Sequence, residues 1–263
     1  MKDIKRYLSL WLKLTNQSFM REFLDRWNAG MFLFGKLLRF GFFTIFLFAL
    51  FAKTSDIGGY TRYQMVFFFL TFNLLDTTAQ LFYREVYRFR PMVVSGDFDL
   101  VLTKPMSALF RVLAGGADPL DLYMLFLYAG LLVYVIMQLG AVTAVGVMAY
   151  LALLVNGLII ATGFHILVLA LAIVTTEVDH AIMIYRDLTM MGRVPTDIYH
   201  QPIRAILTFV LPVGLMMTVP AKAFLGLLSP WTVALSLVLG FLFFVLCHKA
   251  WRYALTRYSS ASS

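Results

Sequence analysis

The segment Gly30-x4-Gly35-Lys36 comes close to the spacing of a loop that binds the phosphates of ATP. A working loop of this kind follows a buried strand and carries Ser or Thr after the lysine, where the hydroxyl group ligates Mg²⁺. Here Leu37 follows the lysine, and residues 31–34 are Met, Phe, Leu and Phe. Four bulky apolar residues cannot turn their amide groups toward a phosphate while keeping their side chains out of water. The segment is therefore not expected to bind ATP.

Other residue types that support catalysis or metal binding are sparse. Cys247 is the single cysteine, which excludes an internal disulfide and a cysteine-rich metal site. His165 has no second His or Cys at metal-ligand spacing, so we expect it to hydrogen-bond between helices. The sequence also lacks the H-E-x-x-H and G-x-S-x-G motifs of membrane hydrolases. We therefore expect no catalytic centre, no metal site and no cofactor in this chain.

The composition predicts an all-α polytopic membrane protein. Of 263 residues, 61% are hydrophobic and 14% charged, against about a quarter charged in globular domains. Backbone polar groups inside a bilayer must be paired, which favours helices.

The net charge of +8 would suggest nucleic acid in a soluble protein, but here the basic residues flank apolar segments. Residues 1–39 carry eight basic and three acidic side chains, and residues 247–263 carry no acid. Both termini are therefore predicted to be cytoplasmic, with an even number of crossings and no nucleic-acid partner.

Residues 1–29 are predicted to form an amphipathic helix in the membrane interface, because apolar residues recur at helical spacing opposite basic ones. A solvated helix packed on another subunit would have the same pattern. Residues 30–52 follow as the first crossing. Gly30 to Lys36 is expected to form the bend between the two helices, with Lys36 and Arg39 reaching the headgroups.

Further crossings are predicted at residues 63–83, 119–138, 142–176 and 231–250. The fourth would be about 52 Å long as a helix, against a hydrocarbon core of about 30 Å. We therefore expect it to protrude, tilt, or break near Gly157 or Gly163.

Residues 177–229 allow two topologies. In the first, residues 177–204 are cytoplasmic and residues 205–223 form the fifth crossing. In the second, residues 180–194 form a short fifth crossing, and the proline-rich residues after it dip back into the membrane from the outer side. Hydropathy favours the first topology, because Arg186 and Asp187 are costly in lipid.

The segment from Ser95 to Arg111 has the residues of a structured turn. Gly96 is expected to end one helix, Asp97 to cap a short helix through Leu102, and Pro105 to start another. We expect exposed apolar side chains flanked by basic ones, which makes the segment either a docking knob or an ordinary solvated loop. The side chains concerned are Phe98, Leu100, Lys104 and Arg111.

A few polar side chains fall within the crossings, and Asp76 is the most costly, at roughly 2.5–3.5 kcal/mol or more in lipid. Asn73 lies beside it on the second crossing. Asp76 could line a substrate path, or it could form a structural ion pair with Arg39 or Lys36 at similar depth.

Two segments together resemble the membrane subunits of ABC-2-type transporters. The first, "SGDFDLVLTKPMSALFR", fits a G-x-x-D-x-x-L-x-[KR]-P loop, and the second, "GRVPTDIYHQPIRAILTFVLPVGLMMTVPAKAFLG", fits a later proline-rich stretch. The matching residues of the first pattern are Gly96, Asp99, Leu102, Lys104 and Pro105. Those of the second are Arg193, Pro195, Pro212, Pro220, Ala221, Leu225 and Gly226.

The resemblance implies a permease subunit of an ATP-driven exporter in a bacterial-type cytoplasmic (inner) membrane. It implies a second permease subunit, identical or different, and separate ATPase subunits that bind ATP and Mg²⁺. It favours the second topology, with six crossings, a cytoplasmic loop at about residues 84–117 and an outer re-entrant hairpin at about 195–228. The loop residues that would transmit ATPase closure are Gly96, Asp97, Phe98, Asp99, Leu100, Lys104 and Pro105. An ATP-independent channel or ion-coupled carrier is the alternative function.

Overall fold

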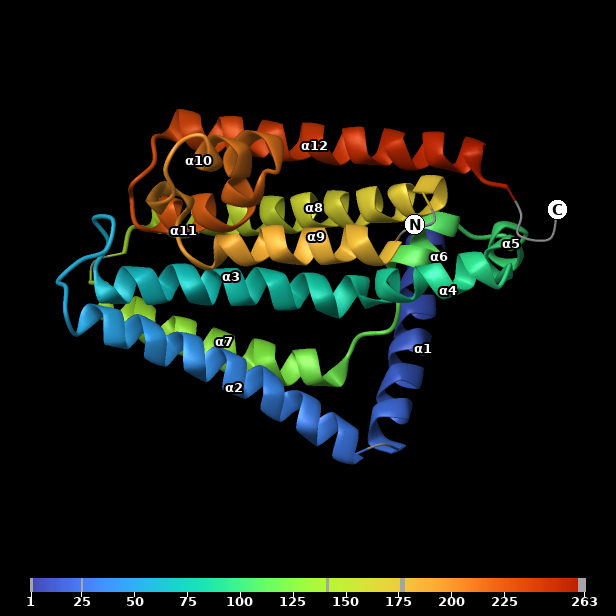
Figure 1. Cartoon of the computed structure of the whole chain (residues 1–263), viewed down its shortest axis with the longest axis horizontal. Helices are drawn as coiled ribbons and strands as arrows, with labels where there is room; N and C mark the ends of the chain where they lie inside the picture. Colours follow the sequence, from blue (N-terminus) through green and yellow to red (C-terminus); the bar gives the residue numbers. More distant parts are fainter. Residues whose placement is uncertain (1, 25, 141, 176–177, 260–263) are drawn as a thin grey trace.

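The computed structural model describes residues 2–24, 26–140, 142–175 and 178–259, and these contain helices but no strand. Five long helices run side by side (Figure 1), and all are long and apolar enough to cross a membrane. They are α2 (Arg26–Phe51), α3 (Arg62–Tyr83), α7 (Pro119–Gln138), α8 (Ala144–Thr175) and α12 (Pro230–Arg257). The all-α membrane fold expected from composition is confirmed, and these helix bounds lie close to the predicted crossings.

The bundle has two distinct ends. The loop end holds α4 (Phe89–Val94), α5 (Asp97–Leu102) and α6 (Ala108–Leu113), together with both chain termini (Figure 1). The 3₁₀ helix η1 (Arg84–Arg88) joins α3 to α4 at this end. The hairpin end, at the opposite side, holds residues 195–229 and the turn at residues 52–61.

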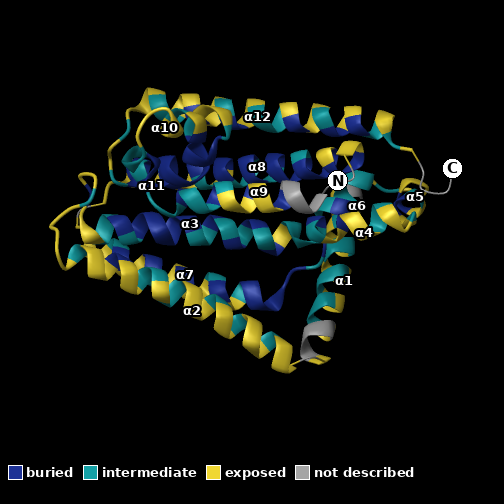
Figure 2. Ribbon diagram, viewed as in Figure 1, coloured by how far each residue is buried: buried dark blue, intermediate teal, exposed yellow. Residues whose placement is uncertain are grey.

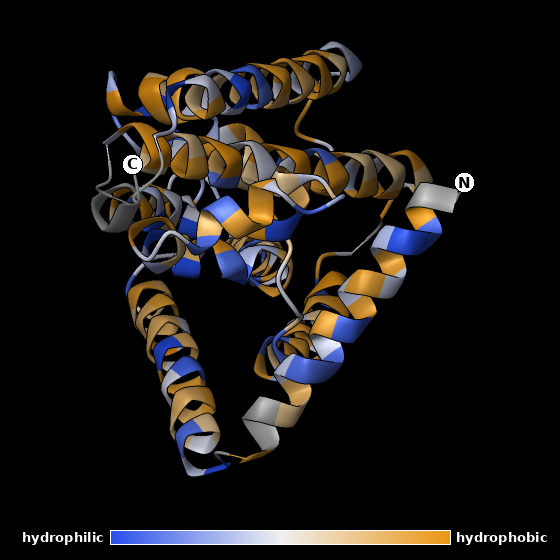
Figure 3. Ribbon diagram, turned by 90° about the vertical axis from the view of Figure 1, so that its right-hand side faces the viewer, coloured by the Kyte–Doolittle hydropathy of each residue, from blue (hydrophilic) through white to orange (hydrophobic). Residues whose placement is uncertain are grey.

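Helix α1 (Lys2–Leu24) lies across the loop end, roughly at right angles to the bundle (Figure 1). Hydrophilic and hydrophobic residues alternate around it (Figure 3). The expected bend at Gly30 to Lys36 is wrong, because these residues lie inside α2, which already begins at Arg26. Helices α1 and α2 instead lie at an angle to each other (Figure 1).

Residues 178–229 follow the path along the bundle that the second topology requires. Helix α9 (Val178–Met190) and the short η2 (Met191–Arg193) run along the bundle beside α8 toward the hairpin end (Figure 1). There the 3₁₀ helix η3 (Thr196–Ile198) meets the turn before α3, and Tyr60 Oη donates a hydrogen bond to Asp197 Oδ2 at 2.8 Å.

Two helical pieces, Ile203–Val210 and Gly214–Phe224, then form a hairpin bent by 78°. They include α10 (Ile203–Ala205), the π-helical η4 (Ile206–Val210) and η5 (Gly214–Thr218), and α11 (Val219–Phe224). The hairpin stays in one half of the bundle (Figure 1). By composition alone the bent pair could be counted as a sixth span, but the chain enters and leaves it at the same end.

The hairpin reaches the middle of α8 because Gly157 has no side chain. A Cβ atom there would lie 2.8 Å from the carbonyl oxygen of Met216, too close for any other residue. Helix α8 itself is continuous through Gly157 and Gly163, so the expected break does not occur. Its 32 residues span about 48 Å, so it must tilt or protrude from a bilayer of about 30 Å.

The buried core lies between α3, α8 and the hairpin (Figure 2). Asn156 Nδ2 on α8 donates to the backbone oxygen of Ser236 at 3.0 Å, which joins α8 to α12. Helix α2 contributes little to this core, since only 6% of its most apolar stretch is buried. Its exposed apolar side chains must therefore contact lipid or another subunit.

Candidate functional site

Gly96 joins α4 to α5 at the loop end. Its φ of +79° is in the left-handed region that glycine adopts most easily. The backbone N–H of Gly96 donates to the oxygen of Val93, so Gly96 ends α4 as expected and also precedes the first residue of α5. Asp97 does not cap α5. It lies in the first turn, where its carboxylate accepts a hydrogen bond from Ser95 Oγ at 2.7 Å.

Phe98 is fully buried, which corrects the expectation that it is exposed. Its ring packs edge-on against Phe89 and Tyr258, with centroids 5.1 Å away in both cases, and lies 6.4 Å from Trp251. Tyr258 Oη also donates to Asp99 Oδ1 at 3.0 Å. Burial and the neighbouring Asp99 carboxylate raise the pKa of Tyr258. Phe98 therefore fixes α5 to the end of α12, a contact that sequence spacing gave no means of finding.

Pro105 does not begin a helix. Helix α6 starts at Ala108, and Ser107 caps it by accepting a hydrogen bond from the N–H of Phe110 at 3.3 Å. The Pro105 carbonyl instead accepts from Arg6 Nη2 at 2.8 Å, and the Ser107 N–H donates to Tyr7 Oη at 3.0 Å. The segment between α5 and α6 is thus attached to α1.

Exposed apolar side chains lie on α4 and α5, and an exposed lysine follows them. We call this set the docking patch, and its residues are Val94, Leu100, Leu102 and Lys104. Leu100 is exposed as expected, with 61% of its surface accessible. The loop therefore has a buried aromatic base and an exposed aliphatic surface.

A paired set of charges lies where the loop end meets the bundle. Lys36 forms an ion pair with Asp121, and Arg84 forms one with Asp118. Arg84 also lies 3.7 Å from the second oxygen of Asp121, whose side chain is 1% exposed. The Lys36 amine is thus held by a carboxylate inside a helix, an arrangement that cannot hold a nucleotide phosphate.

Asp76 does not pair with Lys36, and no ion pair within 4 Å joins it to Arg39 in the part of the chain that the structure describes. Its Oδ2 accepts a hydrogen bond from Gln80 Nε2 at 2.7 Å instead. Asn73 donates to the oxygen of Phe69 in its own helix at 2.7 Å. Asn73 and Arg39 line a small cavity together with Arg193, which sequence reasoning did not place near them.

His165 likewise differs from expectation. Its Nδ1 lies 2.8 Å from the carbonyl oxygen of Ala161 in the same helix, so this hydrogen bond does not join two helices. Within the described residues, no group of three or more His, Cys, Asp or Glu side chains could hold a metal ion.

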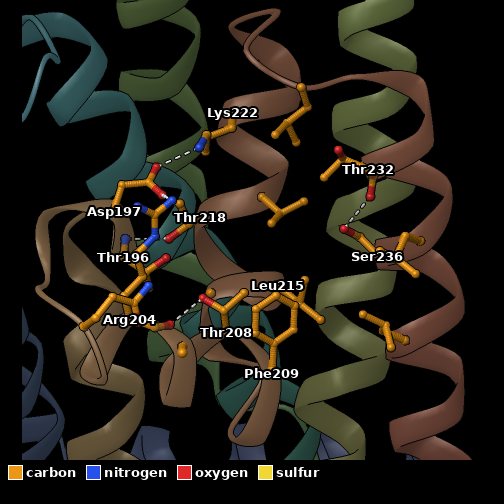
Figure 4. A pocket seen from close by; sticks show the side chains of 17 residues that line it. Thr196, Asp197, Arg204, Thr208, Phe209, Leu215, Thr218, Lys222, Thr232 and Ser236 are labelled. Atoms are coloured by element: carbon orange, nitrogen blue, oxygen red, sulfur yellow. Dashed lines mark hydrogen bonds and ion pairs between the residues drawn. The ribbon is translucent and has the colours of Figure 1, made fainter.

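A cavity of about 240 Å³ opens at the hairpin end, between the hairpin and α12 (Figure 4). Asp197 lies on its wall and accepts hydrogen bonds from Lys222 at 2.8 Å and Tyr60, and pairs with Arg204 at 2.7 Å. Burial alone would raise the pKa of Asp197, but these hydrogen bonds and positive charges lower it below its usual value. Leu215 and Phe209 line the apolar side. The cavity thus has a hydrogen-bonding wall and an apolar wall.

Comparison with known proteins identifies the family. A family model described as ABC-2 family transporter protein matches residues 19–262. Searches of curated proteins and of solved structures found no match. Because the family model covers almost the whole chain, including the docking patch and all the long helices, this chain belongs to the ABC-2 family of transporter proteins.

Proposed function

We propose that this chain is the permease subunit of an exporter driven by separate ATPase subunits, with both termini cytoplasmic and a second permease subunit completing the substrate path. The observation that carries the proposal is the docking patch. Its two exposed leucines lie on α5, which is fixed to α12 through Phe98, and the segment that follows α5 is attached to α1 through the Pro105 carbonyl. A displacement of this patch by a bound partner would therefore also move α1 and α12.

The charged side chains at membrane depth support a path shared with a second subunit. Arg39 on α2 and Arg186 on α9 are exposed in the single chain. Each would cost at least roughly 2.5–3.5 kcal/mol if it faced lipid. Such side chains normally face a bundle interior or a water-filled cavity. A path between two permease subunits would supply that surrounding and would also cover the exposed face of α2.

Co-purification with an ATPase tests the proposal. The chain alone should neither bind nor hydrolyse ATP. With its ATPase, sought in a neighbouring gene, it should form a complex that couples ATP hydrolysis to transport. Lys36→Ala should leave the nucleotide affinity of that complex unchanged, because Lys36 contacts Asp121 rather than a phosphate. Transport that ignores ATP and follows an ion gradient would instead identify a channel or carrier.

Cysteine labelling tests the proposed orientation in a Cys247→Ser background. Cysteines at Ser55 and Gly59 should react with an impermeant reagent from outside, and cysteines at Ser95 and Ser259 only from inside. Tyr199 decides between the two topologies, because it lies at the hairpin end, where its Oη bonds the Met191 carbonyl at 3.0 Å. A cysteine at Tyr199 should be shielded or react from outside. Free labelling from the cytoplasm would refute the proposed orientation of the hairpin.

A further inference from the structure

Positive and negative charges are balanced at the loop end of the bundle, but not around Asp76, which lies farther toward the hairpin end. Lys36 and Arg84 are matched there by Asp121 and Asp118. Nearer the hairpin end, a single carboxylate, Asp76, interacts electrostatically with arginines from three different segments. They are Arg39 of α2, Arg186 of α9 and Arg193 of η2.

Arg39 and Asp76 lie farther along their helices from the loop end than the two ion pairs do. Arg39 is one helical turn beyond the Lys36–Asp121 pair, about 4.5 Å along α2, and Asp76 is about 12 Å beyond Arg84 along α3. Asp187 is a second acid, next to Arg186 in the sequence. Adjacent residues of a helix point about 100° apart, so Asp187 is directed away from Arg186. Positive charge therefore exceeds negative charge around Asp76, in a region where uncompensated charge is strongly unfavourable.

Aromatic rings hold one of the arginines in place. The Arg193 guanidinium lies 5.6 Å from the ring centre of Phe43 and 5.8 Å from that of Phe72. Such cation–π contacts orient a guanidinium without using its N–H donors. Arg193, Arg39 and Asn73 enclose a space of about 10 Å³, which has room for about one water molecule. A larger ligand must therefore bind on the exposed side of the arginines.

Helix α2 places apolar surface next to this charge. Phe42 and Phe46 follow Arg39 at i+3 and i+7, so they share its face of the helix. Both rings are more than half exposed, at 67% and 53%. A cationic site and an exposed aromatic strip thus lie end to end on one surface, which matches a molecule with a charged head and an apolar chain.

We propose that Arg39, Arg186 and Arg193 bind the anionic headgroup, a phosphate or carboxylate, of an amphiphilic substrate whose apolar chain lies along Phe42 and Phe46. Arginine suits this role because its planar N–H donors match phosphate and carboxylate oxygens in pairs. Asp76 is then the internal anion that partly neutralises the arginines while the site is empty. The substrate class rests on the proposed transport function, whereas headgroup binding can be measured on this chain alone.

The test measures binding of dodecyl phosphate to the purified full chain in the uncharged detergent dodecyl maltoside, from the shift in thermal unfolding. Dodecyltrimethylammonium, with the same apolar chain and a positive head, is the comparison. Dodecyl phosphate should bind and stabilise the protein, and the cationic amphiphile should not. Equal affinity for the two amphiphiles would overturn the proposal.

Substitutions identify the residues. Arg193→Gln and Arg39→Gln should each weaken dodecyl phosphate binding about tenfold or more, as expected for loss of a charge-assisted hydrogen bond. Asp76→Asn should strengthen it, because the competing carboxylate is removed. Arg252→Gln, at an exposed arginine of α12 away from the site, is the matched control and should bind like the parent. Parental affinity in both Arg193→Gln and Arg39→Gln would refute the site.

Competition with lipid distinguishes the sources of the headgroup. Mixed micelles containing phosphatidylglycerol should displace dodecyl phosphate if the substrate is a membrane lipid, and phosphatidylcholine should displace it less. Competition by single-chain anions alone would support a free amphiphile with the same head. A failed co-purification with the ATPase would refute the proposed function and leave these binding results unaffected.

Discussion

Leu100→Asp should weaken association with the ATPase at least tenfold while leaving the permease folded. Leu100 is the most exposed apolar side chain of α5 and lies in the docking patch. An apolar anchor at the centre of an interface is typically worth about 2 kcal/mol or more, and about 1.4 kcal/mol corresponds to tenfold in affinity. Placing a carboxylate there adds a desolvation penalty. The measurement is the dissociation constant of the ATPase from permease in nanodiscs.

Two further variants separate contact from shape. Leu100→Met keeps an apolar side chain of similar volume and should bind like the parent. Phe98→Ala should also weaken association, but through the loss of roughly 3–5 kcal/mol of packing that fixes α5 to α12, which the fluorescence of Trp251 should report. If Leu100→Asp binds the ATPase with parental affinity and unaltered coupling, the docking patch is a connector and the coupling proposal fails.

Asp121→Asn should destabilise the folded chain by about 3–5 kcal/mol, the usual effect of leaving a buried ion without its partner. The Asp121 side chain is 1% exposed and Lys36 is 13% exposed, so solvent cannot replace the lost pair. Arg84 loses a nearby charge in the same variant, since it lies 3.7 Å from Asp121. Thermal unfolding in detergent and the yield of folded protein measure the effect.

A second substitution should recover much of this loss. Lys36→Met combined with Asp121→Asn removes both charges, and the double variant should be more stable than Asp121→Asn alone. Lys53→Met changes an exposed lysine in the turn after α2 and should have little effect. Parental stability of Asp121→Asn would show that the pair contributes little, and that Lys36 is held by its surroundings instead.

The sequence by itself determined the helices and the family. Long apolar runs must pair their backbone polar groups inside a bilayer, which a helix does within itself, so the approximate bounds of the five long helices followed from hydropathy. The glycine at position 96 and the prolines of residues 192–226 supported the resemblance to ABC-2 transporters, which the match to residues 19–262 confirms. The end of α4 at Gly96 also followed from sequence, because the left-handed conformation there favours glycine.

Hydropathy disagreed with the structure where a helix carries polar side chains on one face and buried apolar ones, Ile182 and Tyr185, on another. It disfavoured a crossing with Arg186 and Asp187, yet α9 runs beside α8 through this region. The hairpin can sit against α8 because Gly157 leaves room for the backbone at Met216, a contact between residues far apart in sequence.

The tertiary structure also decided which side chains serve each site. Phe98 and Leu100 are two positions apart on a short helix, and sequence spacing assigned both to the surface. Only the arrival of Trp251 and Tyr258 from the other end of the chain buries Phe98 and leaves Leu100 exposed. Likewise, the sequence offered Asp76 as a possible partner for Lys36. Its partner is Asp121 because α7 begins at the depth where α2 carries Lys36, which no local pattern could reveal.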